Sequence, residues 1–231
     1  EGKQFAAAKL QNSTTAAIYL TETYSSYYWT REDVELLDFE INEAGEITKY
    51  TGSATEVVIP SSYSVLEDGT IIEGTDHTIT GIADASSSSE GAFANKNITS
   101  VTIPDSVTSI GIYAFRGCSS LTSITIPDSV TSIGSYAFSG CTSLESIIVD
   151  EGNAVYHSDG NCLIETGSKT LIAGCKTSII PSDGSVTSIG SSAFRGCSSL
   201  TSVTIPDSVT SIGRYAFYNC TSLSSVTFEN V

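Results

Sequence analysis

The chain has 231 residues, of which 40% are hydrophobic and only 16% are charged, so it is long enough to bury one extended core or two small ones. Its 26 acidic residues against 10 basic residues give a net charge of -16, and such a surface repels nucleic acids and anionic membranes. No apolar run approaches the about 18 residues of a membrane-spanning helix. We therefore expect no nucleic-acid partner and no membrane insertion.

Residues 1–37 lie outside the repeated part of the chain and are interpreted as an N-terminal cap. The stretch "FAAAKLQNSTTAAIYL" predicts a helix. An aromatic cluster follows, made of Tyr24, Tyr27, Tyr28 and Trp29. Clustered aromatic side chains can stack on sugars or anchor a protein interface, and they can equally plug the cap that a repeat protein needs over its first unit. Both interpretations stay open.

Residues 38–231 contain one repeated unit with a period of 23 residues. Two insertions interrupt the repeat, at about 61–81 and 150–180, and a degenerate copy precedes the first of them. A fixed period of this length is typical of a solenoid, in which each unit covers the apolar face of its neighbour. The regular copies begin at Asn97, Ser120, Ser143, Ser199 and Ser222.

Each unit is expected to form one coil of the solenoid. Residues 121–126 alternate between apolar and polar types, which predicts a strand, and Pro127 ends it because proline cannot donate to a ladder. A short apolar return segment follows at residues 130–133. Phe138 and Cys141 then have the spacing of a helical turn. The predicted coil is therefore a strand, a corner, a short return segment and a turn.

Stacked coils would place equivalent side chains in columns through the core. One column is expected to contain Phe93, Phe115, Phe138, Phe194 and Phe217. A second column is expected to contain Cys118, Cys141, Cys197 and Cys220 as free, buried thiols. Cys162 and Cys175 flank a predicted hairpin, so a disulfide between them is an open alternative to two free thiols.

The string "LTSITIPDSVTSIGSYAFSGCTSL" resembles the repeat of the BspA-like leucine-rich-repeat family of bacterial surface proteins. The "YHSDG" stretch in the second insertion resembles a hairpin that interrupts units in that family. The resemblance implies a right-handed leucine-rich-repeat solenoid with inserted β-hairpins over residues 38–231. It also implies an exported protein at the bacterial cell surface that serves in adhesion or ligand binding.

The sequence offers no pattern of a catalytic site. It lacks the nucleophile-elbow, phosphate-loop and dinucleotide-binding motifs, and catalysis by a serine would need a base held beside it. The two histidines, His77 and His157, lie in different insertions without metal-ligand spacing. We expect no enzymatic activity, no metal and no cofactor.

The strand residues that point away from the core are the predicted binding site. They can instead form a hydroxyl ladder that helps to hold the sheet, and this alternative stays open. The expected partner is an extracellular protein, with the hairpin at residues 152–178 as a neighbouring wall. The competing hypotheses are a carbohydrate ligand at the aromatic cluster or a structural spacer. The predicted binding residues are Thr102, Thr125, Ile148, Thr204 and Thr227.

Overall fold

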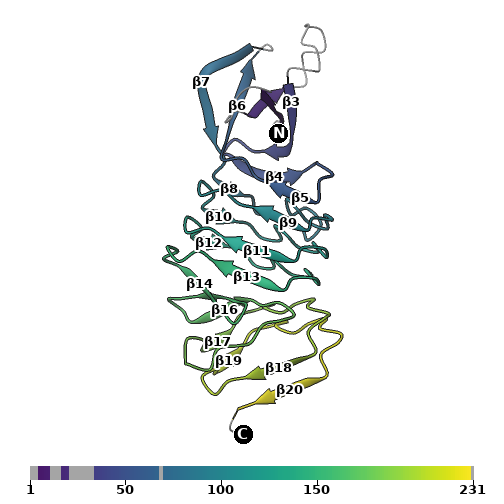
Figure 1. Ribbon diagram of the computed structural model, residues 1–231, viewed down its shortest axis with the longest axis vertical. Coiled ribbons are helices and arrows are strands. Elements are labelled where there is room, and N and C mark those ends of the chain that lie inside the picture. The colour runs from purple at the N-terminus through teal and green to yellow at the C-terminus, as the bar shows by residue number, and fades with distance from the viewer. Residues whose placement is uncertain (1–4, 11–16, 21–33, 68–69, 230–231) are drawn as a thin grey trace.

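A computed structural model describes residues 5–10, 17–20, 34–67 and 70–229. These residues form strands and turns and contain no helix. Figure 1 shows the coils stacked along the long axis of the molecule, with the N-terminal strands at one end and the last coil at the other. The stack is the solenoid that the 23-residue period predicts, with the coil arrangement that the resemblance to leucine-rich repeats implies.

One side of the stack, which we name the strand face, carries one parallel strand from each coil. Strands β11 and β13 pair with Ser123 opposite Ser146, so the register equals the repeat period. Within β11, Ile124 and Ile126 are buried and the residues between them are exposed, which is the alternation predicted from the sequence. The strands of this face are β5 (Glu56–Val58), β9 (Ser100–Thr102), β11 (Ser123–Ile126), β13 (Ser146–Val149), β18 (Ser202–Ile205) and β20 (Ser225–Phe228).

The return segments lie on another side of the stack, where they belong to two separate sheets that we together name the second sheet. Its regular members are two-residue strands that pair in parallel, and isoleucines such as Ile110 and Ile189 point into the core with 1% and 0% of their surface exposed. These strands are β8 (Gly81–Ile82), β10 (Ser109–Ile110), β12 (Ser132–Ile133), β17 (Ser188–Ile189) and β19 (Ser211–Ile212).

Both insertions form antiparallel strands that join the second sheet. The first insertion forms a hairpin of two strands, and the second forms a three-stranded meander whose last strand pairs in parallel with β17. The strands are β6 (Ser62–Glu67), β7 (Thr70–Thr78), β14 (Tyr156–Asp159), β15 (Cys162–Glu165) and β16 (Thr170–Ala173).

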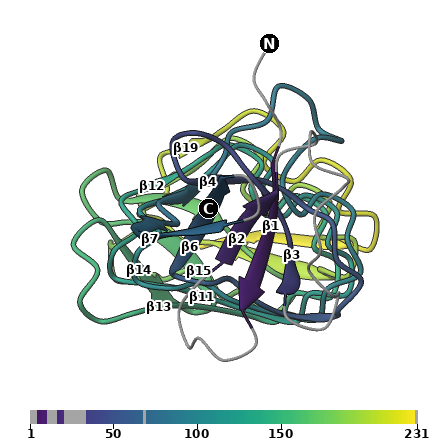
Figure 2. The ribbon, with the colours of Figure 1, turned by 90° about the horizontal axis from the view of Figure 1, so that it is seen from above.

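The helix predicted near the N-terminus is wrong, because the described parts of that segment are strands. Figure 2 shows β1 between β2 and β3, with which it pairs antiparallel. Pairing with two neighbours outweighs the helix propensity of an alanine-rich segment, which amounts to tenths of a kcal/mol per residue. That this region caps the solenoid stays a prediction. The strands are β1 (Phe5–Leu10), β2 (Ala17–Leu20), β3 (Val34–Ile41) and β4 (Glu46–Tyr50).

The third side of the stack, which we name the turn edge, consists of residues 111–118, 134–141, 190–197 and 213–220. The expected helical turn is not formed there, because the backbone N–H groups alternate between two directions. Ala114 N–H donates within its own coil to Gly111, whereas Phe115 N–H donates to Ala137 of the next coil at 2.9 Å. Successive β-turns therefore replace the helical turn and bind neighbouring coils together.

The phenylalanine column is formed in two parts rather than one. Phe93 stacks on Phe115 at 4.9 Å between ring centroids and Phe115 stacks on Phe138 at 5.8 Å, while Phe194 stacks separately on Phe217 at 5.1 Å. The column breaks where the second insertion enters the stack. There Gly174 lies against Phe194, so close that a Cβ on Gly174 would sit 2.0 Å from the ring.

All six cysteines are free and buried, so the alternative of a disulfide between Cys162 and Cys175 is wrong. The predicted column of free thiols is confirmed. Its thiols bond to the backbone of the preceding coil: Cys118 Sγ donates to the carbonyl of Phe93 at 3.0 Å. Because burial disfavours the thiolate, the pKa of Cys118 is raised to about 12.

Candidate functional site

The five predicted binding residues all lie on the outer surface of the strand face. Each is exposed, and the paired strands bring them side by side: Thr125 lies opposite Ile148, and Thr204 lies opposite Thr227. Thr102 lies opposite Val58 of the degenerate first copy. The geometry therefore gathers the predicted residues into a file that crosses the strands.

The hydroxyl groups of this file are available to a ligand. The hydroxyl ladder considered from the sequence does exist, but it lies at the entry to the strands, where Thr122 Oγ1 donates to the carbonyl of Thr99 and Thr99 Oγ1 donates to that of Thr55. By contrast, the hydroxyls of Thr125 and Thr204 have no hydrogen-bond partner among the described residues. The threonines at the start of the strands therefore hold neighbouring coils together, and the outward-facing threonine hydroxyls remain free to bond to a ligand.

Two apolar side chains lie in the middle of the file. Ile148 is 47% exposed, and Ile179 of the second insertion is 74% exposed. Ile179 precedes the buried Ile180 and then a proline, as Thr125 precedes Ile126 and Pro127 in a regular coil. The insertion therefore contributes a degenerate coil to the strand face, and sequence reasoning missed it. The signal was "SIIP", a shortened copy of the regular "SVTIP".

This inserted coil is fixed beside β13 by polar contacts. The Lys176 ammonium lies 2.6 Å from a carboxylate oxygen of Glu145, and Lys176 N–H donates to the carbonyl of Leu144. The strands of the hairpin pair with the return segments rather than with β13, and that the hairpin forms a wall beside the binding site stays a prediction. The hairpin contacts this side at two points: Val149 N–H of β13 donates to Ser158 Oγ of β14 at 3.0 Å, and Ile179 N–H donates to the carbonyl of Gly160 in the turn at 2.8 Å.

A second group of candidate residues, which sequence reasoning did not single out, lies along the turn edge. Tyr113 stacks on Tyr136 with 5.1 Å between ring centroids. The guanidinium carbon of Arg195 lies 5.4 Å from the Tyr136 ring and 4.8 Å from the Tyr218 ring. Tyrosine and arginine are the side chains most often found in binding hot spots, and the repeated "YAF" in the sequence was the available signal.

The tyrosines of the turn edge occupy an unusual backbone conformation. Tyr113, Tyr136 and Tyr215 have φ values of 62°, 63° and 60°, and Ser192 takes the same conformation at the equivalent position. A left-handed conformation costs a non-glycine residue roughly 1–3 kcal/mol. The same conformation recurs at the equivalent position of each coil of the turn edge, so the tyrosines stand at matched points along the edge.

The other residues singled out from the sequence are an aromatic cluster and two histidines. The aromatic cluster of Tyr24, Tyr27, Tyr28 and Trp29 lies outside the described residues. His77 stacks on Tyr63, and His157 shares a hydrogen bond with Thr166 at 2.8 Å. In the described ranges, no three potential metal ligands come together. The part of the chain that the structure describes also holds no helix with the length and apolarity of a membrane span.

Comparison with known proteins places the repeat among bacterial sequences. The profile of the BspA type leucine rich repeat region matches residues 86–163 and 165–231, in six copies. The sequence has no significant match among curated proteins.

Solved structures of bacterial leucine-rich-repeat proteins are also similar to the chain. One from Eubacterium ventriosum is 23% identical with a TM-score of 0.50, and the match covers 78% of this chain and 56% of that one. A leucine rich cell surface protein from Faecalibacterium prausnitzii is 23% identical with a TM-score of 0.39, over 89% of this chain and 77% of that one. The leucine rich repeat protein of T. pallidum is 26% identical with a TM-score of 0.41, over 90% and 70%.

Proposed function

Because the chain belongs to the BspA-type leucine-rich-repeat family of bacteria, we propose that it is a non-catalytic recognition module that binds an extracellular protein. The module is exported and acts at the bacterial cell surface. Its binding site is the strand face around Thr125, Ile148 and Thr204. The observation that carries this proposal is the file of exposed, unpaired threonine hydroxyls with apolar side chains at its centre.

The chemistry of the file suits a protein partner. Its residues repeat at the spacing of neighbouring strands, about 4.8 Å, so that a long partner segment meets many aligned contacts at once. Ile148 and Ile179 supply apolar anchors, and the surrounding hydroxyls supply a polar rim, which is the usual anatomy of an interface. No residue of the file carries a charge, so desolvating it costs less than desolvating a charged surface.

The charge of the whole chain bears on the kind of partner. A net charge of -16 produces a negative potential that attracts basic proteins and accelerates their association. We therefore propose a basic partner or a basic segment of one, with association that slows as salt is added.

The experiment is a screen of the purified chain against extracellular-matrix proteins by surface plasmon resonance, repeated with two variants. The first variant carries Thr125→Lys, Ile148→Lys and Thr204→Lys on the strand face. The matched control carries the same three added charges at exposed hydroxyl residues off the strand face, as Ser132→Lys, Ser135→Lys and Thr221→Lys, whose hydroxyls likewise have no hydrogen-bond partner among the described residues.

We expect the strand-face variant to lose binding and the control to retain it, with both keeping the circular dichroism of the parent chain. Equal losses in the two variants would mean that added charge alone weakens binding, and the proposed site would be wrong. Retention in the strand-face variant, together with loss on deletion of residues 1–37, would move the site to the N-terminal segment.

A further inference from the structure

The second insertion omits one turn of the turn edge. A regular coil passes from its return segment to its cysteine through a turn such as "GSYAFSGC" at residues 134–141. The inserted coil passes from β16 through Gly174 directly to Cys175. Gly174 N–H donates to the carbonyl of Ala193 at 2.9 Å, as Phe115 does to Ala137 in the regular stack. Counted from the paired residues Leu171 and Ile189, three residues precede the cysteine in the inserted coil, where seven precede it in the next regular coil.

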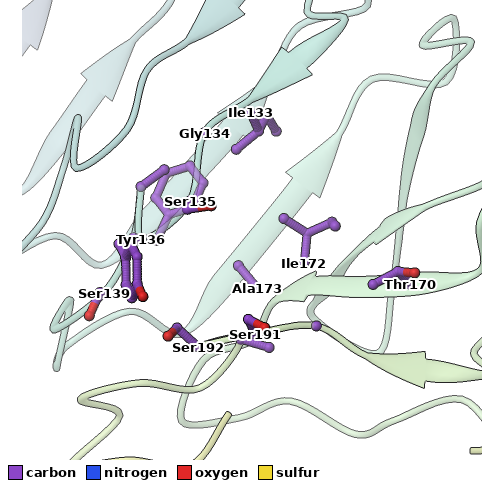
Figure 3. A pocket seen from close by; sticks show the side chains of 14 residues that line it. Ile133, Gly134, Ser135, Tyr136, Ser139, Thr170, Ile172, Ala173, Ser191 and Ser192 are labelled. Carbon is purple, nitrogen blue, oxygen red and sulfur yellow. The ribbon is translucent and has the colours of Figure 1, made fainter. Parts of the chain in front are cut away.

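The omitted turn leaves a pocket of about 220 Å³ between residues 133–139 and 190–193. Figure 3 shows that Tyr136 and Ile133 bound it on one side and that Ser191, Ser192 and Ala173 face them across it. None of the residues that line the pocket carries a charge. Its volume lies below the roughly 300 Å³ at which pockets for drug-sized ligands begin, so it has room for one small ring.

Hydrogen-bonding groups are left unpaired on both sides of this pocket. In the regular stack, Tyr113 N–H donates to the carbonyl of Ser135 in the next coil. The equivalent N–H groups of Tyr136 and Phe138 have no partner among the described residues, and the carbonyl of Ser191 accepts no bond there either. The pocket therefore exposes two donors and one acceptor that every regular junction satisfies.

A buried side chain adds a further unpaired group. Ser192 is only 7% exposed, and its hydroxyl has no hydrogen-bond partner in the described structure. A buried hydroxyl without a partner costs about 1–3 kcal/mol, and Ser192 lines the pocket. A ligand that bonds to this hydroxyl would recover that cost.

These observations define the chemistry of the missing occupant. It is uncharged, because no charged side chain lines the pocket. It carries hydroxyl groups, since these both donate and accept and so can satisfy N–H, C=O and Oγ–H groups together. It also has an apolar face, because Tyr136, Ile133 and Ile172 form part of the wall and aromatic rings stack on such faces.

We propose that this pocket binds one neutral saccharide ring. This site lies apart from the strand face and goes beyond the proposed function. Arg195 acts as a positioning residue, because its guanidinium contacts the Tyr136 ring from the next turn of the turn edge.

The test is saturation-transfer difference NMR on the full chain with methyl glycosides of glucose, galactose, mannose and N-acetylglucosamine. The blocking variant is Ser191→Trp, which places a large ring over the pocket from an exposed position. The matched control is Arg214→Trp, at the equivalent exposed position of the next coil. A third variant, Ser192→Ala, removes only the buried hydroxyl.

We expect saturation transfer to at least one of the four glycosides, with amide shifts at Tyr136 and Ser192. Ser191→Trp should weaken binding at least tenfold, Ser192→Ala should weaken it several-fold, and Arg214→Trp should leave it unchanged. Ser192→Ala should fold with unchanged or higher stability, which separates a lost contact from a lost fold. Absence of transfer to all four glycosides, or equal binding by the blocking variant, would refute the pocket as a sugar site and leave water as its occupant.

Discussion

Replacing Phe115 by alanine should destabilise the chain more than the same change at Phe138 or Phe217, two members of the phenylalanine column that lie on either side of the second insertion. The Phe115 side chain is fully buried, and its ring stacks on Phe93 on one side and on Phe138 on the other. Buried Phe→Ala changes cost about 3–5 kcal/mol, and each aromatic pair adds about 0.5–1.5 kcal/mol to area burial. With two ring pairs and no exposure, Phe115→Ala should cost about 5 kcal/mol.

The same reasoning ranks two other positions. Phe138 has a ring partner on one side only and borders the pocket on the other, so Phe138→Ala should cost about 3 kcal/mol. Phe217 is half-buried with one partner, and its loss should cost about 2 kcal/mol. Ser135 is exposed at a position occupied by isoleucine or arginine in other coils, so Ser135→Ala should stay within about 0.5 kcal/mol.

Urea denaturation followed by circular dichroism measures this series. The informative comparison is Phe115→Ala against Phe138→Ala, since both remove the same group from the same position of the repeat. A cost at Phe138 equal to or above that at Phe115 would show that the ring column continues through the second insertion. The broken column, and with it the origin of the pocket, would then be wrong.

Three further predictions follow from individual contacts. Burial raises the pKa of Cys118 to about 12 from an ordinary 9.0, so the unfolded thiol loses its proton first as the pH rises. The free energy of unfolding should therefore fall from about pH 9 towards pH 12, and it should fall less steeply in Cys118→Ala. Gly174→Ala should destabilise by about 1–3 kcal/mol in thermal unfolding, because the new Cβ meets the Phe194 ring. Arg195→Ala should cost about 1–2 kcal/mol by urea denaturation, through the loss of three cation–π contacts, and a double-mutant cycle with Tyr218→Leu should show coupling.

The regular part of the fold follows from the sequence because one pattern specifies it repeatedly. The alternation around Ile124 fixes which residues of a strand are buried, and the 23-residue period fixes the register between strands. The outward placement of Thr125 and Ile148 could be predicted for the same reason. Each new coil repeats the same local preferences, so local and global signals agree.

The turn edge and the second insertion could not be predicted in the same way. The spacing of Phe138 and Cys141 fits both a helical turn and the β-turns that are formed. The better signal was Gly140, a residue suited to the positive φ of 78° that it adopts. Ile179 and the pocket were missed because the insertion appears in the sequence only as an interruption of the repeat. The interruption does not show that the inserted coil has a segment on the strand face but lacks a turn on the turn edge.

The omitted turn at Gly174 also has a mechanical consequence. Between regular coils three backbone hydrogen bonds, such as those from Tyr113, Phe115 and Gly117, join the turns of the turn edge. Across the insertion the described residues contain one backbone bond between turns, from Gly140 to Arg195, beside a side-chain bond from Ser139 to the same carbonyl. Hydrogen bonds that act in parallel share an applied load, so each bond bears the most force at the junction with the fewest bonds. If the molecule is pulled along its long axis, the junction across the second insertion should open first and divide the solenoid into two segments that extend one after the other.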